Sequence, residues 1–383
     1  MTVASHELGE LVDIVMGQAP PGSACNKDGN GTVFVKAGEF QERSPIVREW
    51  TTQPLKMASP DDTLVCVVGA TAGKVNYSAF ECAIGRSIAA VKPQRARLDP
   101  LFLYQFLQTK VEQLRDRSQG AAQGVITREM LQSLKLALPP LPEQRRIAAI
   151  LDKADVLRIK RREVLAQLDR LVTSIFFESF GEPSLNTRGW KICRLDELTN
   201  KITDGEHINP EFSEHGMPIV MAGNVLENSI TLNNAKKVDV HLGQKFRKKC
   251  NPEKGDLLMV SRGATIGRMC PVNIDDAFCL MGSVILIKPK KEHIHPAFVT
   301  ALLKNPAMRS TLYKTSGSSA QQAIYLKDLK NLSCILPPYE LQLQFAEKVA
   351  QIDKLRLPHS QSIQQFNAFF ATLQYRAFKG GLK

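Results

Sequence analysis

The chain has 383 residues, 43% of them hydrophobic, which is ordinary for a soluble globular protein with two or three domains. Its net charge of +12 favours a nucleic-acid ligand, with a solvated basic surface as the alternative. No run approaches the ~18 apolar residues of a membrane span, and residues 1–17 do not resemble a signal peptide. None of the eight cysteines forms a Cys-x-x-Cys pair, so we expect no zinc site and a reducing cytoplasm.

Residues 1–140 are predicted to form a mixed α/β domain. Short β-rich runs at 33–35, 64–68 and 87–91 are bounded by glycine, aspartate and proline. Residues 100–114 then show apolar side chains at helical spacing, with Pro100 at the first position, where proline is tolerated. The domain ends in a Leu-Pro-Pro sequence at 138–140.

A long amphipathic helix is predicted in the spacer region 141–182. Its apolar residues recur at alternating steps of three and four for about four heptads, interrupted only by Arg161, which is typical of a coiled coil. From about Pro142 to Glu178 it would be roughly 55 Å long. No small domain needs an internal helix of that length, so we expect it to separate two domains.

The second half repeats the first with a period of roughly 190 to 200 residues. β-rich runs at 219–221, 257–260 and 284–287 precede a helical pattern at 296–312 and a second Leu-Pro-Pro at 336–338. This second domain, 183–338, is followed by a second spacer helix, 339–383, which Pro358 should kink or break.

The two spacer helices would each expose an apolar stripe if they were isolated. Antiparallel packing against each other would bury both stripes, whereas packing of each helix on its own domain is the alternative. The predicted fold class is α/β. Two similar mixed α/β domains are separated by two long antiparallel helices that form a coiled coil, with pseudo-twofold symmetry.

Both halves contain Gly-Ala-Thr-x-Gly followed by a basic residue, at 69–74 and 263–268. The glycines permit a positive φ, which predicts a turn between two strands. The following cation either meets a DNA phosphate or is solvated, and a Gln-containing loop before each Leu-Pro-Pro either reads adenine or is a mobile surface loop. The candidate DNA contacts are Thr71, Lys74, Arg86 and Gln123 in one half and Arg262, Thr265, Arg268 and Gln321 in the other.

The sequence lacks the residues of an active site. Leu-Pro-Pro-Tyr at 336–339 resembles the Asn/Asp-Pro-Pro-Tyr of amino-methyltransferases, but leucine cannot accept a hydrogen bond from the amine. No Gly-x-Gly-x-x-Gly cofactor loop occurs, and Asp61 and Asp62 have no downstream Glu-x-Lys to complete a nuclease site. His207 and His215 are interpreted as surface histidines. We expect no catalysis by this chain alone, and no metal.

Three motifs carry a family resemblance. Residues 138–147 read Leu-Pro-Pro-Leu-Pro-Glu-Gln-Arg-Arg-Ile, 204–210 read Asp-Gly-Glu-His-Ile-Asn-Pro and 17–21 read Gly-Gln-Ala-Pro-Pro. The first two are similar to Leu-Pro-Pro-Leu-x-Glu-Gln-x-x-Ile and Asp-Gly-x-His-x-x-Pro, and the third to another common domain opening, of the specificity subunits (HsdS family) of type I restriction-modification systems. The whole chain resembles this family, although the second Leu-Pro-Pro segment lacks the Glu-Gln pair.

The resemblance implies a non-catalytic subunit whose two target-recognition domains each read one half of a bipartite, asymmetric DNA site. It implies that the helices dock two methyltransferase subunits, which methylate adenine, and that restriction (translocase) subunits join for cleavage. The partners would use S-adenosylmethionine and ATP, and this chain would bind neither. The residues expected to pair the helices and to bind the methyltransferase are Ile147, Ile150, Leu157, Leu168, Leu171, Phe345, Ile352 and Phe366.

Two other functions remain open. A coiled-coil scaffold would not need the net charge of +12 or the repeated Gly/Gln loops. A stand-alone DNA-modifying enzyme would need a cofactor loop or metal-binding carboxylates. Purification of the chain alone discriminates these functions, because a scaffold should be soluble and indifferent to DNA, an enzyme should act unaided, and a specificity subunit should do neither well.

Overall fold

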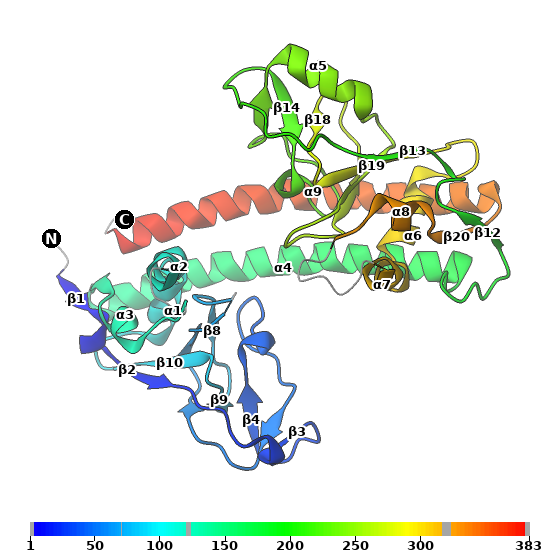
Figure 1. Ribbon diagram of the computed structural model, residues 1–383. Helices are drawn as coiled ribbons and strands as arrows, with labels where there is room; N and C mark the ends of the chain where they lie inside the picture. Colours follow the sequence, from blue (N-terminus) through cyan, green and yellow to red (C-terminus); the bar gives the residue numbers. More distant parts are fainter. Residues whose placement is uncertain (1–3, 70, 120–123, 316–322, 380–383) are drawn as a thin grey trace. The chain divides into compact units, whose positions relative to one another are not determined.

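The computed structural model describes residues 4–69, 71–119, 124–315 and 323–379 (Figure 1). The chain divides into two compact units: Met1–Val164 with His359–Lys383 (unit 1), and Leu165–Pro358 (unit 2). Two 40-residue helices, α4 (Leu141–Phe180) and α9 (Tyr339–Phe378), each contribute one segment to each unit. The end of the second long helix therefore packs with the first domain, as antiparallel pairing of the two helices requires.

Unit 1 is built on an antiparallel sheet in the order β2 (Val12–Met16), β10 (Ile88–Pro93), β7 (Thr63–Cys66), β8 (Val75–Tyr77). A second sheet has the order β3 (Cys25–Asn26), β5 (Trp50–Thr51), β4 (Thr32–Val35), β9 (Cys82–Ile84), β6 (Met57–Ala58), with β4 and β9 parallel. Val65 packs in one apolar cluster, whereas Leu64 and Cys66 pack in another. Both faces of β7 are therefore buried, which explains its uninterrupted apolar sequence.

Unit 2 repeats this plan. Its main sheet has the order β13 (Thr199–Asp204), β19 (Val284–Pro289), β16 (Leu257–Val260), β17 (Met269–Pro271), and its smaller sheet β15 (Lys236–Val238), β14 (Met217–Val220), β18 (Cys279–Leu280). β14 and β18 are parallel, like β4 and β9. In each unit a two-stranded sheet joins the start of the domain to its end: β1 (Ser5–Glu7) with β11 (Lys135–Ala137), and β12 (Lys191–Arg194) with β20 (Ser333–Leu336). The predicted β-rich runs and the internal repeat are confirmed.

The helical segments predicted at 100–114 and 296–312 are wrong in one respect, because each is two helices. They are α1 (Pro100–Gln108) with α2 (Val111–Gln119), and α6 (Pro296–Lys304) with α7 (Pro306–Thr315). Asn305 cannot remain helical before Pro306, and its Oδ1 instead caps α7 by accepting from the Ala307 amide at 2.9 Å. The remaining helices are α3 (Arg128–Gln132), α5 (Val240–Lys249) and α8 (Leu326–Lys330), with 3-10 turns at Leu8–Glu10, Gly22–Ala24, Ala37–Glu39 and Ala222–Asn224.

Pro358 was predicted to kink or break the second spacer helix, and the break does not occur, because α9 runs through this residue without interruption. Proline removes one backbone N–H and leaves the carbonyl of Lys354 without its helical partner. Both residues are exposed, so water can hydrate that carbonyl. The proline therefore removes one helical hydrogen bond, which water replaces, and the helix continues.

Antiparallel pairing of the long helices is confirmed within each unit. In unit 1 the Arg158 guanidinium lies 4.3 Å from the ring centre of Phe370, and that of Arg161 lies 5.1 Å from the ring centre of Phe366. In unit 2 the rings of Phe176 and Phe345 meet edge to face at 5.8 Å. Arg161, which interrupts the apolar pattern, is thus accommodated over an aromatic ring.

Three of the α4 residues assigned to helix pairing and methyltransferase binding lie outside the buried stripe. Ile150, Leu157 and Leu171 are 36%, 50% and 46% exposed. The buried stripe in unit 1 instead runs through Leu151 and Asp155, and Arg158 is half-buried beside it. Because this stripe includes charged side chains, the apolar pattern of the sequence did not identify it. Of the other predicted pairing residues, Ile147, Phe345 and Ile352 are buried, and Leu168 and Phe366 are half-buried.

A glutamine in the first turn of each long helix fastens the helix to its domain. Gln144 accepts from the Asp99 amide at 2.8 Å and donates to the carbonyls of Arg97 and Pro139 at 2.9 and 2.8 Å. Gln342 accepts from the amide of His295 and donates to the carbonyls of His293 and Pro337, the same three partners in the second copy. The second Leu-Pro-Pro segment therefore keeps the contact although it lacks the Glu-Gln pair.

Candidate nucleic-acid interface

One edge of the main sheet in each unit collects the candidate DNA contacts. β2 and β7 end at this edge and β10 and β8 begin there, because neighbouring strands are antiparallel. The same holds for β13, β16, β19 and β17 of unit 2. The sheet-edge loops carry Thr71, Lys74 and Arg86 in unit 1 and Arg262, Thr265 and Arg268 in unit 2.

The Gly-Ala-Thr-x-Gly segments are tight turns between strands, as predicted. They join β7 to β8 and β16 to β17, and all four glycines have a positive φ between 73° and 91°. In each turn the second glycine donates its amide to the end of the preceding strand, Gly73 to Cys66 at 2.7 Å and Gly267 to Val260 at 2.8 Å. A Cβ on Gly73 would lie 2.9 Å from the Val111 carbonyl oxygen, so this position needs glycine for space as well as for φ.

The cations that follow these turns are bound within their own units. Lys74 Nζ donates to the carbonyl of Phe40 at 2.9 Å, and the Arg268 guanidinium donates to the carbonyl of Val225 at 3.4 Å. Both carbonyls directly follow a 3-10 turn, so the two contacts are equivalent. Each head group is half-buried and keeps further N–H donors, and a phosphate contact by either cation stays a prediction.

The other predicted contacts differ in accessibility. Arg86, Arg262 and Thr71 are exposed, and Thr265 is half-exposed. Gln123 and Gln321 lie outside the described residues. The chain returns to the sheet edge just after each of them, where Ile126 donates to the Val67 carbonyl at 2.9 Å and Ile324 donates to the Ser261 carbonyl at 2.8 Å.

His207, interpreted from the sequence as a surface histidine, belongs to the sheet-edge loops of unit 2. Its Nε2 lies 2.6 Å from Asp204 Oδ2, and its ring packs against Gly282, where a Cβ would lie 2.4 Å from Nδ1. Burial opposes ionisation of Asp204, but the hydrogen bond from His207 and the positive charge of Lys249 outweigh it and hold the pKa of Asp204 below its ordinary value. Gly282 precedes β19 by two residues, as Arg86 precedes β10, and the His207 ring fills the space that a side chain at position 282 would need.

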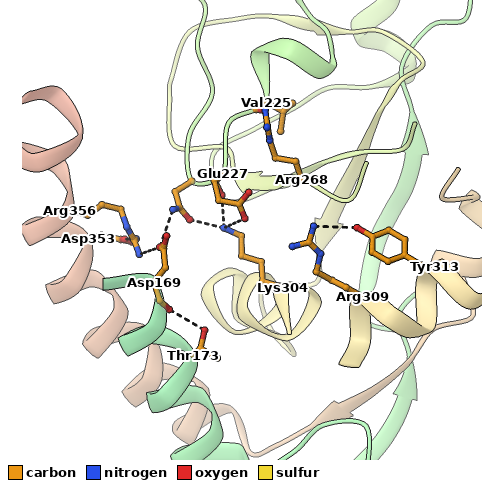
Figure 2. A network of polar contacts seen from close by, with 11 residues as sticks. Asp169, Thr173, Val225, Glu227, Arg268, Lys304, Arg309, Tyr313, Asp353 and Arg356 are labelled. Carbon is orange, nitrogen blue, oxygen red and sulfur yellow. Dashed lines mark hydrogen bonds and ion pairs between the residues drawn. The ribbon is translucent and has the colours of Figure 1, made fainter. Parts of the chain in front are cut away.

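A polar network fixes the domain of unit 2 to the helix pair (Figure 2). The Asn228 amide donates to Asp169 Oδ1 at 3.2 Å, and its oxygen accepts from Lys304 Nζ at 2.6 Å. Asp169 also accepts from Arg356 at 2.7 Å, which links α4 to α9. Burial lowers the pKa of Lys304 and raises that of Asp353, whose carboxylate pairs with Arg356.

Unit 1 has an equivalent attachment. Glu42 and Arg43, which follow the 3-10 turn Ala37–Glu39 as Glu227 and Asn228 follow Ala222–Asn224, pair with Arg162 and Asp152 on α4. Lys74 and Arg268 hold the carbonyls two residues before these attachment points. The cation after each Gly-Ala-Thr-x-Gly turn therefore supports the loop that joins the domain to the helices.

Comparison with known proteins identifies a family with this architecture. The family model described as "Type I restriction modification DNA specificity domain" matches residues 2–170 and 187–368. The chain belongs to this family. A Methanocaldococcus jannaschii protein named as the specificity subunit of type I restriction enzyme MjaX is 37% identical over 161 residues, 41% of this chain and 38% of that relative. The EcoBI specificity subunit of Escherichia coli is 23% identical over 336 residues, 78% of this chain and 69% of the relative.

A solved structure supports the fold. The S subunit of a type I restriction-modification system from M. genitalium matches 98% of this chain and 96% of its own with a TM-score of 0.55, at 17% identity. The predicted fold class, two similar mixed α/β domains with long antiparallel helices, is confirmed. Among the described residues, no helix is long and apolar enough to cross a membrane. The part of the chain that the structure describes also contains no group of three or more His, Cys, Asp or Glu that could hold a metal ion.

Proposed function

We propose that this chain is the DNA-binding specificity subunit of a type I restriction-modification complex. The carrying observation is the duplicated domain, with basic side chains on the sheet-edge loops of both copies, in a chain matched by the specificity-domain family over nearly its whole length. Each domain reads one half of a bipartite DNA site. Because the loops of the two domains differ in sequence, the two halves differ as well.

The proposed subunit has no catalytic role. Partner methyltransferase subunits bring S-adenosylmethionine and methylate adenine, and ATP-using restriction subunits cleave, in the cytoplasm. The sequence-level support is the absence of a glycine-rich cofactor loop and of a polar residue before Pro337 and Pro338. Methyl transfer to DNA by highly purified chain, without any partner, would contradict this part of the proposal.

Exposed apolar side chains on α4 are the proposed surface for the methyltransferase. In unit 1, Ile150 and Leu157 are seven residues apart, so they lie on one face of the helix, and neither packs in the core. In unit 2, Leu171 and Phe177 of the same helix are 46% and 37% exposed. Large apolar side chains in this number on a solvent face are typical of a protein interface.

A methylation map tests the proposal. DNA from cells that express the chain with its cognate methyltransferase should carry one new two-part methylated sequence. Exchanging residues 1–138 for those of a relative should change one half of that sequence only, because each domain has its own core. A map with no new methylated site, or an exchange that altered both halves, would overturn the two-reader model.

A further inference from the structure

Unit 2 contains a basic helix that has no counterpart among the described residues of unit 1. The ten residues of α5 include four cations and no acidic residue, and the cations are Lys245, Arg247, Lys248 and Lys249. In unit 1, residues 40–62 occupy the corresponding place before the central strand β7, and this fully described stretch contains no helix. The basic helix is therefore an addition to one reading domain.

The inner face of α5 is fixed firmly to the small sheet of unit 2. Asp239 caps the helix by accepting from the amides of His241 and Leu242 at 2.9 and 3.3 Å. Phe246 is 3% exposed and packs with Ile219, Val238 and Cys279. The outer face is consequently presented in a defined orientation.

The four cations divide into two pairs. Arg247 donates twice to Asn251 Oδ1, at 3.0 and 2.6 Å, and Lys249 donates to the Gly205 carbonyl at 2.9 Å and lies 3.4 Å from Asp204 Oδ1. Lys245 and Lys248 are exposed, and within the described ranges neither takes part in an ion pair. His241, Gln244, Lys245 and Lys248 follow one another at i, i+3, i+4 and i+7, so they share one outer face.

Favourable placement at a helix C-terminus does not account for this face. Cations in the last turn interact with the negative end of the helix dipole, which suffices for Arg247, Lys248 and Lys249. Lys245 lies before the last turn, and an exposed glutamine lies beside it. A helix face with two lysines around one glutamine has the chemistry of a DNA-reading helix, because lysine neutralises phosphates and glutamine can pair with adenine.

We infer that the outer face of α5 contacts duplex DNA in the half-site read by unit 2, an inference that rests on the proposed function. Lys245 and Lys248 contact phosphates, and Gln244 faces base edges in the major groove, which admits an α-helix. The bond from Lys249 to Gly205 sets the end of α5 beside the loop that carries His207. The helix and the sheet-edge loops of unit 2 thus form one continuous DNA surface.

The test measures the salt dependence of binding to a 40-base-pair duplex of mixed sequence, with the full chain in complex with its methyltransferase. The double variant Lys245→Ala/Lys248→Ala should reduce the slope of log K against log salt by about 1.8, since each phosphate contact contributes about 0.9. The matched control is Lys327→Ala/Lys330→Ala, which removes the same charge from exposed positions on α8 of the same unit. The slope measured for this control should differ from that of the wild-type complex by less than the about 0.9 that one phosphate contact contributes.

A second variant reports on sequence reading. Gln244→Ala should relax discrimination about ten-fold at one base position of one half-site in a methylation map, and leave the other half-site unchanged. An equal slope for both double variants, with an unaltered map for Gln244→Ala, would overturn the role of α5 while leaving the proposed function intact. Failure of the wild-type complex to bind DNA in a salt-dependent way would instead overturn the proposed function, and the inference with it.

Discussion

The glutamines in the first turns of the long helices should contribute far more to stability than an ordinary surface glutamine. Gln342 is fully buried, and replacing it by methionine keeps the side-chain volume but removes three hydrogen bonds, those to His295, His293 and Pro337. Each bond contributes about 1 kcal/mol net, and the orphaned His295 amide adds about 1 kcal/mol or more. We therefore expect Gln342→Met to lower the free energy of unfolding by about 3 to 4 kcal/mol, and Gln144→Met to do the same in unit 1.

Calorimetry of the full chain is the appropriate assay, because two units need not unfold in a single transition. Hydrogen exchange adds a local readout, since the His295 amide should exchange faster in Gln342→Met. The control is Gln344→Met, two residues along the same helix at an exposed position, which should change stability by about 0.5 kcal/mol or less. Equal stabilities for Gln342→Met and Gln344→Met would refute the reasoning that these bonds fasten the helix to its domain.

Three further predictions concern the helices and the thiols. Leu157→Glu, with Lys160→Glu as an exposed control on the same helix, should abolish co-purification of the methyltransferase without changing the circular dichroism of the chain; retained binding would exclude the proposed surface. Arg158→Met should lower the free energy of unfolding by about 3 kcal/mol at neutral pH, because the buried Asp155 carboxylate loses the ion pair that it makes with Arg158 at 3.2 Å. Burial already raises the pKa of Asp155 against the opposing effect of Arg158, so the folded variant takes up a proton more readily than the unfolded chain. The loss of unfolding free energy, measured by urea titration against the wild type, should therefore shrink on acidification. A loss that did not change with pH would contradict this. Brief alkylation of the native protein should label Cys25 alone, because the other seven cysteines are buried and burial raises the pKa of Cys270 and Cys279 to about 12; rapid labelling of either in a mass spectrum would count against the packing described.

The sequence predicted the architecture because its signals are local or periodic. Strands such as β16 coincide with an uninterrupted apolar run, and the repeat doubles each such signal. The division between α6 and α7 was also readable, since Asn305 before Pro306 combines a capping residue with a residue that restricts its predecessor. The predicted continuous helix gave too much weight to apolar spacing.

The contacts that failed to be predicted depend on packing. Lys74 donates a hydrogen bond to the carbonyl of Phe40, 34 residues away, and the sequence around Lys74 contains no signal for that partner. The buried stripe of α4 was predicted only in part, because Asp155 and Arg158 lie along it and the heptad pattern assumes apolar side chains there. Gln342 could have been found by aligning the two Leu-Pro-Pro segments position by position, which sets it opposite Gln144.

The division of the long helices between the units has a consequence for how the chain is made. Unit 2 is continuous from Leu165 to Pro358, whereas the core of unit 1 includes Phe370 and Ala377, and Phe378 packs against the rings of Phe102 and Phe106 at 5.1 and 5.6 Å. During synthesis the core of the first domain therefore stays incomplete, with an apolar surface uncovered, until residues beyond 358 emerge from the ribosome. The part of the protein that is translated first is the last to be completed, and until then its apolar surface is open to aggregation.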